Sequence, residues 1–203
     1  MKSLFDYEIK EYDMVELIAN VFRKGKIGII YGESGVGKTI STIKALNAAN
    51  EKPILLDFDD NDSPESNNCE YIHIDGLKII DNGKLNLKIE YPKSRIYIVD
   101  TWKSFNSNFG NENDAMLALE QLIDLTGSTI IIIDHNVDIA SKQDIPMMDG
   151  SLVNHLGFKL WLRVGKDKEK CRNVLEIKKL RGYSGNKSIK DWMIDDEMDK
   201  LLN

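Results

Sequence analysis

The chain has 203 residues, 42% of them hydrophobic and 30% charged, and its formal net charge is −6. This length suits one compact domain with a sizeable core and is short for two, and the composition is that of a globular protein. The acidic balance argues against a dedicated nucleic-acid binder. Two distant cysteines, Cys69 and Cys171, argue against a zinc site or a disulfide framework. The start lacks the apolar region of a signal peptide and the apolar runs are too short to span a bilayer, so we expect a cytoplasmic protein without a membrane partner.

The charge is distributed unevenly along the chain. Residues 159–190 hold 11 Lys and Arg against 3 Asp and Glu, whereas residues 1–158 hold 15 against 25. A basic stripe can bind an anion even on an acidic protein. A solvated pair of lysine-rich strands is the alternative interpretation.

Short apolar runs alternate along the chain with segments in which the apolar residues have the spacing of a helix. Helices are predicted at 14–22, 38–50 and 113–126. Strands are predicted at 26–31, 53–58, 71–74, 85–91, 95–100, 129–134, 158–164 and 172–179. Asn82 and Gly83 predict a turn, Asn113 is expected to cap the last helix, and Gly127 to end it. This pattern predicts an α/β fold, with a mainly parallel central sheet flanked by helices and antiparallel strands near the C-terminus.

The strongest motif is GESGVGKT at residues 32–39, which fits the P-loop pattern G-x-x-x-x-G-K-[ST] between a predicted strand and a predicted helix. Its glycines let backbone N–H groups turn toward phosphates, at the positive end of the helix. Lys38 is expected on the β- and γ-phosphates and the Thr39 hydroxyl on Mg²⁺. The motif therefore predicts ATP and Mg²⁺ as cofactors. The predicted binding residues are Gly32, Glu33, Ser34, Gly35, Val36, Gly37, Lys38 and Thr39.

Two carboxylates follow predicted strands and face the same edge of the sheet. Asp100 ends the run IYIVD and is expected to hold Mg²⁺, directly or through water. A turn or helix cap is the alternative for this residue. Asp59, in LLDFDDND, is expected to orient the attacking water, with Asp57 and Asp60 as rivals. A solvated acidic turn is the alternative there.

Three further polar residues are candidates for contacts with the γ-phosphate. His135, or its neighbour Asn136, ends the apolar run IIIID and could hydrogen-bond the γ-phosphate, although it could also be an ordinary strand-end residue. Lys179 and Arg181 precede a glycine-rich turn and could reach a neighbouring subunit's γ-phosphate, with surface salt bridges as the alternative. The other two histidines, His73 and His155, have no partners at ligand spacing and are expected to be structural.

The ordered set GESGVGKT, LLDFDD, IYIVDTWKSF, NENDAM, TGSTIIIIDHN, DGS and KKLRGYSG resembles the RecA-fold ATPases, especially the RepA-like hexameric replicative helicases. The late segment KLRGYSG, with Lys179, Arg181, Gly182 and Gly185, is similar to a late motif of DnaB-like helicases. The resemblance spans about residues 24–195 and implies one RecA-like domain over 1–203. It also implies a ring or filament homo-oligomer, expected as a hexamer, with ATP at subunit interfaces. The resemblance implies that Lys38 and Thr39 bind phosphate and Mg²⁺ and that Asp100 is the Walker-B carboxylate. It implies that Asp59 stands where the family usually has a catalytic glutamate and that His135 senses the γ-phosphate. It also implies that Lys179 and Arg181 form a finger, a pair of cations that reaches the nucleotide site of a neighbouring subunit.

The resemblance implies that single-stranded DNA binds the loops after the Asp100 and His135 strands. The first loop offers Trp102, Lys103, Phe105 and Phe109, which could stack on bases or could equally be core residues. The second loop, 136–150, has one lysine against three aspartates and suits a phosphate backbone badly.

Three functions remain open from the sequence: a helicase-like motor in replication, a RecA-like recombination or strand-annealing protein, and an ATP-controlled assembly or switch protein that binds no nucleic acid. The segment SKQD, 141–144, matches the guanine-reading motif of GTPases poorly. Residues 101–150 contain no arginine, unlike the lid of a small-molecule kinase.

Overall fold

The computed structural model describes residues 25–59, 69–135, 146–148, 150–153, 156–164, 173–180 and 191–193. Several predictions fall outside these ranges: those for 14–22, Asp60, Asn136, His155, Cys171, Arg181, Gly182, Gly185 and most of the loop 136–150. The strands are β1 (Ile27–Gly32), β2 (Ile54–Asp57), β3 (Ile72–Asp75), β4 (Ile80–Asp81), β5 (Lys84–Leu85), β6 (Ile96–Asp100), β7 (Thr129–His135), β8 (Phe158–Val164), β9 (Asn173–Leu180) and β10 (Asp191–Met193). The helices are α2 (Lys38–Ala48), α3 (Trp102–Asn106), α4 (Glu112–Thr126) and α5 (Gly150–Val153), with a 3-10 turn at Gly76–Ile79.

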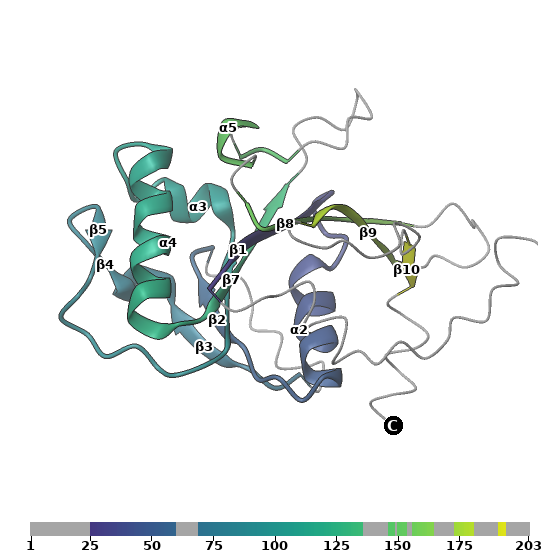
Figure 1. The fold of residues 1–203 in the computed structure, drawn as a ribbon, viewed down its shortest axis with the longest axis horizontal. Helices are drawn as coiled ribbons and strands as arrows, with labels where there is room; N and C mark the ends of the chain where they lie inside the picture. Colours follow the sequence, from purple (N-terminus) through teal and green to yellow (C-terminus); the bar gives the residue numbers. More distant parts are fainter. Residues whose placement is uncertain are drawn as a thin grey trace, which may run out of the picture.

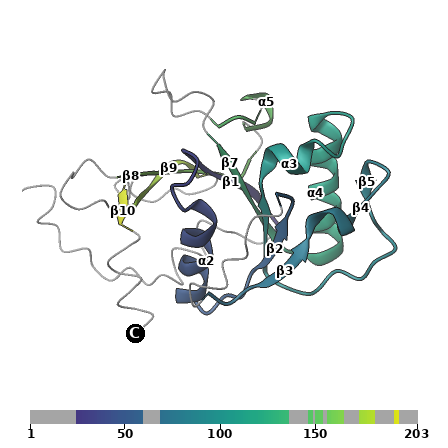
Figure 2. The same ribbon diagram turned by 180° about the vertical axis from the view of Figure 1, so that it is seen from behind.

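The main sheet of the described part has the strand order β10-β9-β8-β1-β7-β6-β2-β3. Strands from β8 to β3 pair in parallel, whereas β9 is antiparallel to β8 and β10 to β9. Helix α2 lies on one face of the sheet and helices α3 and α4 lie on the other (Figures 1 and 2). The α/β fold with a mainly parallel sheet and antiparallel C-terminal strands is therefore confirmed.

The central strands are apolar along their length because helices cover both faces of the sheet. All six residues of β1 are buried, and so are six of the seven in β7. One core cluster joins alternate residues of these strands, such as Ile29, Tyr31 and Ile132, to Leu119 and Leu122 of α4. The helical spacing predicted for α4 thus packs as expected.

Two local predictions are wrong. Asn113 does not cap α4: the helix begins at Glu112, and the side chain of Asn111 accepts a hydrogen bond from the backbone N–H of Asp114 at 3.0 Å. Asn111 also donates to the Asp114 carboxylate at 2.8 Å, a reciprocal pair that fixes the helix start. Gly127 ends the helix at φ 68°, as predicted.

The strand predicted at 85–91 is only two residues long, Lys84–Leu85. Asn82 and Gly83, at φ 52° and 70°, form the predicted turn to β4. Beyond Leu85 the chain turns, because the Asn86 side chain accepts from the backbone N–H of Lys88 at 3.1 Å and its carbonyl accepts from the Tyr91 hydroxyl at 2.8 Å. Among the described residues, no helix has the length and apolarity needed to cross a membrane.

Candidate nucleotide-binding site

The carboxyl ends of four neighbouring parallel strands bring the candidate residues to one edge of the sheet. Gly32 at the end of β1 is in register with His135 at the end of β7. Asp100 at the end of β6 is in register with Asp57 at the end of β2. Ligands of open parallel sheets collect at this edge.

The loop from Gly32 to Gly37 joins β1 to α2 and depends on two glycines. Gly35 and Gly37 have φ values of 74° and 82°, which L side chains rarely adopt. Gly37 is also the N-cap of α2, so the unpaired N–H groups of the first helical turn point into the loop. Glu33, Ser34 and Gly35 are exposed at its tip. Such a loop offers backbone donors and a helix N-terminus to a phosphate group.

Lys38 is the buried cation of this loop. It is only 5% exposed, and its ammonium group donates to the carbonyls of Glu33 at 2.8 Å and Gly32 at 3.3 Å. Burial lowers the pKa of Lys38, while the carboxylates of Asp100 and Asp134 act to raise it. The lysine is thus held at the loop by carbonyl groups and by two nearby negative charges.

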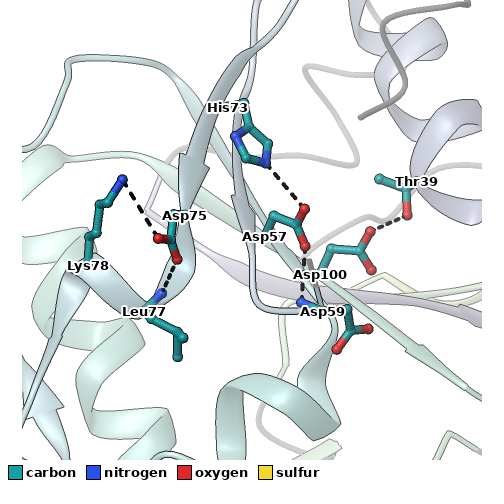
Figure 3. A network of polar contacts seen from close by, with 8 residues as sticks. All are labelled: Thr39, Asp57, Asp59, His73, Asp75, Leu77, Lys78 and Asp100. Carbon is teal, nitrogen blue, oxygen red and sulfur yellow. Dashed lines mark hydrogen bonds and ion pairs between the residues drawn. The ribbon is translucent and has the colours of Figure 1, made fainter. Parts of the chain in front are cut away.

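Asp100 and Thr39 form the closest side-chain contact of the site. The Thr39 hydroxyl donates to Asp100 Oδ2 at 2.6 Å, as Figure 3 shows. The pKa of Asp100 is raised to about 6, mainly by burial; the Thr39 bond and the charge of Lys38 act to lower it, and the charges of Asp59 and Asp57 act to raise it. A hydroxyl and a carboxylate held together are oxygen ligands of the kind Mg²⁺ prefers, so these two residues fit a magnesium ion.

The rival carboxylates Asp57, at the end of β2, and Asp59, just after it, lie in different surroundings (Figure 3). Asp57 is buried, with one oxygen accepting from the backbone N–H of Asp59 at 3.0 Å and the other 3.2 Å from His73 Nε2. Asp59 is half-buried, and its charge acts on both Asp100 and His135. Asp59 is therefore the carboxylate with a side chain open to the site, whereas Asp57 is occupied by structural partners.

His135 lies beside Lys38. Its Nδ1 is 3.3 Å from the Lys38 ammonium nitrogen, and it accepts from the lysine when the ring is neutral with its proton on Nε2. Burial lowers the pKa of His135, the charges of Lys38 and Lys103 lower it further, and Asp59 acts in the opposite direction. The ring is therefore neutral at pH 7, with Nε2 as a hydrogen-bond donor.

Asp134 is a residue of this site that the sequence did not single out. It is fully buried on β7, and its Oδ2 accepts from the backbone N–H of Met148 at 2.9 Å. The only signal in the sequence is a carboxylate inside the apolar run IIIIDH, one residue before the predicted sensor.

Lys179 is not brought to the P-loop of its own chain. On the antiparallel strand β9 it pairs with Lys159 of β8, which pairs in turn with Ile29 of β1. It therefore lies three residues before Gly32 along the strand direction and two strands away from β1. Arg181, its expected partner, lies outside the described residues.

The aromatic residues after Asp100 are mainly core residues. Trp102 is 2% exposed and Phe105 is fully buried, and only Lys103 of the four candidate DNA contacts is exposed. The Phe105 ring packs edge-on against Phe58 at 5.1 Å between centroids and against Phe109 at 4.8 Å. Of the two alternatives for Trp102 and Phe105, the structure supports the core one, because both side chains are covered by the protein.

We expect Phe105→Ala to lower the free energy of unfolding by about 3–5 kcal/mol, because it removes a fully buried ring and leaves a cavity. Chemical denaturation monitored by circular dichroism measures this loss. Lys103→Ala, on the exposed side of the same helix, is the control and should unfold within about 0.5 kcal/mol of the wild type. Equal stability of the two variants would contradict the core assignment.

Comparison with solved structures supports the fold. The flagellar accessory protein FlaH from Methanocaldococcus jannaschii is similar over 81% of this chain and 84% of its own, with a TM-score of 0.50 and 14% identity. A KaiC-like protein from Pyrococcus horikoshii OT3 is similar over 83% of this chain and 87% of its own, with a TM-score of 0.53 and 12% identity. No protein-family model matches the sequence, and no curated protein matches it. The finer resemblance to RepA-like and DnaB-like helicases stays a prediction, whereas the structural likeness shows that this chain has the RecA-like fold.

Proposed function

We propose that this chain is a magnesium-dependent ATPase. The observation that carries the proposal is the hydrogen bond of 2.6 Å between Thr39 and Asp100, next to the buried Lys38 of a P-loop. In this arrangement the lysine and the loop N–H groups would bind the phosphates, and the hydroxyl and carboxylate would hold Mg²⁺. The metal would supply charge neutralisation between the β- and γ-phosphates.

The other residues at the same edge have roles that follow from their surroundings. His135 would donate from Nε2 to the γ-phosphate while its Nδ1 faces Lys38. Asp59 would accept a hydrogen bond from the attacking water, because its half-buried side chain is open to the site. Asp57 would hold the turn in which Asp59 lies.

We expect Asp59→Asn to lower kcat for ATP hydrolysis by about 10²–10⁴-fold, the usual range for loss of a catalytic base, with little change in ATP affinity. Asp57→Asn is the matched comparison. It should reduce thermal stability, because it weakens the contact with His73, and should reduce kcat less. A larger loss of kcat in the Asp57 variant would make Asp57, not Asp59, the water-positioning residue.

Two kinds of function remain for ATP hydrolysis by this chain: work on nucleic acid, and control of an assembly or switch without nucleic acid. The resemblance of the motifs favours a helicase-like motor on single-stranded DNA, or a recombination or strand-annealing protein. The net charge of −6 and the burial of Trp102 and Phe105 favour an ATP-controlled assembly or switch protein that binds no nucleic acid.

Steady-state ATP hydrolysis at low salt separates these functions. The assay is run with single-stranded DNA, with RNA and with neither. Hydrolysis stimulated several-fold by DNA would support the motor and recombination functions, and a strand-unwinding assay would then choose between them. Hydrolysis indifferent to both nucleic acids would favour the assembly function, and absence of hydrolysis would contradict the ATPase proposal itself.

Assembly into a ring or filament is part of the proposal, because Lys179 lies far from the P-loop of its own chain. Lys179 and Arg181 would then complete the site of a neighbouring subunit. Mixing an inactive Lys38→Ala chain with an inactive Arg181→Ala chain should restore part of the hydrolysis, since a mixed interface can hold one intact site. A mixture as inactive as its components would contradict a finger acting between subunits.

A further inference from the structure

Asp134 carries a buried oxygen that the site described above does not use. The residue is fully buried at the second-last position of β7. Its Oδ2 is hydrogen-bonded to Met148 N–H, whereas Oδ1 has no hydrogen-bond partner among the described residues. Buried polar atoms without partners are rare in folded proteins because each one costs free energy. Protonation would therefore stabilise a buried carboxylate that has one oxygen without a partner.

The surroundings of Asp134 connect it to the phosphate end of the site. Next to it, the backbone N–H of Met147 donates to the carbonyl of His135 at 2.9 Å, so residues 147 and 148 are fastened to the end of β7 by two bonds. The charged group that acts on Asp134 is Lys38 from α2, whose ammonium group also contacts the neutral His135 ring. Lys38 is thus both the counter-charge of Asp134 and the residue expected on the β- and γ-phosphates.

We infer that Asp134 is a positioning residue of the proposed nucleotide site, and that its carboxyl group takes up a proton when phosphates engage Lys38. The inference rests on the proposed ATP binding. Phosphates that pair with Lys38 remove the charge that compensates Asp134 and bring further negative charge close to it, and both effects disfavour a buried carboxylate. A proton from solvent forms an O–H bond at Oδ1, which cancels the buried negative charge.

Proton uptake near neutral pH requires that the pKa of Asp134 already be raised in the protein without nucleotide. Burial raises its pKa to about 6, although the backbone N–H groups of Met148, His135 and Met147 and the charge of Lys38 act to lower it. A further increase on nucleotide binding brings the pKa toward neutrality. By linkage, Asp134 then favours ATP binding more at pH 6 than at pH 8, and each unit by which phosphates raise its pKa adds about tenfold to the affinity at pH values below the pKa of the free protein.

Isothermal titration calorimetry of ATP·Mg²⁺ binding at pH 7, in buffers of different ionisation enthalpy, counts the protons taken up. The variants are Asp134→Asn and, as control, Asp124→Asn on the exposed side of α4. Asparagine keeps an oxygen for Met148 N–H and imitates the protonated acid. We expect the wild type and the control to take up more protons per nucleotide than Asp134→Asn, whose ATP affinity should depend less on pH between 6 and 8. The difference in proton uptake between the wild type and Asp134→Asn excludes the protons taken up by ATP and His135, because these groups titrate in every variant.

Equal proton uptake in the wild type and Asp134→Asn would overturn the inference and leave the ATPase proposal intact. A wild-type protein that does not bind ATP would overturn both. Thermal unfolding shows whether the asparagine variant folds. If it does not, infrared difference spectra of the wild type, labelled with isotopic aspartate, must show a protonated-carboxyl band growing on ATP addition, and its absence would overturn the inference.

Discussion

Lys38→Ala is expected to abolish measurable ATP hydrolysis, with a loss in kcat of at least about 10²–10³-fold, the range for removal of one preorganised charge-stabilising group. The variant should also bind ATP more weakly, because charge-assisted hydrogen bonds to phosphates are lost from a buried position. A coupled assay for ADP release measures the first effect, and fluorescence of a labelled ATP analogue measures the second.

Lys84→Ala is the control for this experiment, because Lys84 is an exposed lysine on the β4–β5 hairpin. It should hydrolyse ATP like the wild type. Circular dichroism must show that Lys38→Ala is folded, since the lysine also bonds the carbonyls of Gly32 and Glu33. A folded Lys38→Ala protein with undiminished hydrolysis would place the reaction at another site.

Asp100→Asn is expected to weaken Mg²⁺ binding, so that ATP hydrolysis requires a higher concentration of Mg²⁺. The amide still accepts the hydrogen bond from Thr39, but it lacks the negative charge that a hard divalent cation requires. Titration of MgCl₂ at fixed ATP should give a half-saturating concentration at least about tenfold higher than in the wild type, if the lost ligand is worth 1.4 kcal/mol or more.

Asp75→Asn is a matched control, since Asp75 also ends a parallel strand and lies in register with Asp57. Its side chain caps the turn at Gly76–Ile79, a bond that asparagine keeps. An unchanged magnesium titration in Asp100→Asn, or an equal shift in Asp75→Asn, would contradict the assignment of Asp100 to the metal.

The parts of this protein that the sequence predicts best are those fixed by local pattern. Strands β1, β6 and β7 are continuous apolar runs, and such runs arise when both faces of a sheet are covered. The P-loop is readable because only glycine adopts the φ of 82° at Gly37 without strain. The place of Asp100 beside Thr39 follows from these two signals together, because a P-loop and an aspartate-terminated strand share one edge.

The parts that the sequence does not predict depend on contacts between distant segments. Asp57 and Asp59 differ in their surroundings partly because His73, on a strand sixteen residues later, contacts Asp57. Helix α3 is five residues long, too short for its periodicity to reveal that Trp102 and Phe105 face the core. Asp134 is hidden in an apolar strand, and its partner Met148 is fourteen residues away.

Binding of ATP·Mg²⁺ at this edge of the sheet can be tested by a crystal structure with Mg²⁺ and a non-hydrolysable ATP analogue. We expect phosphates in the loop of residues 32–39, the Lys38 ammonium group on the β- and γ-phosphates, and Mg²⁺ held by Thr39 and Asp100. Nucleotide bound elsewhere, or a metal held without Thr39 and Asp100, would contradict it.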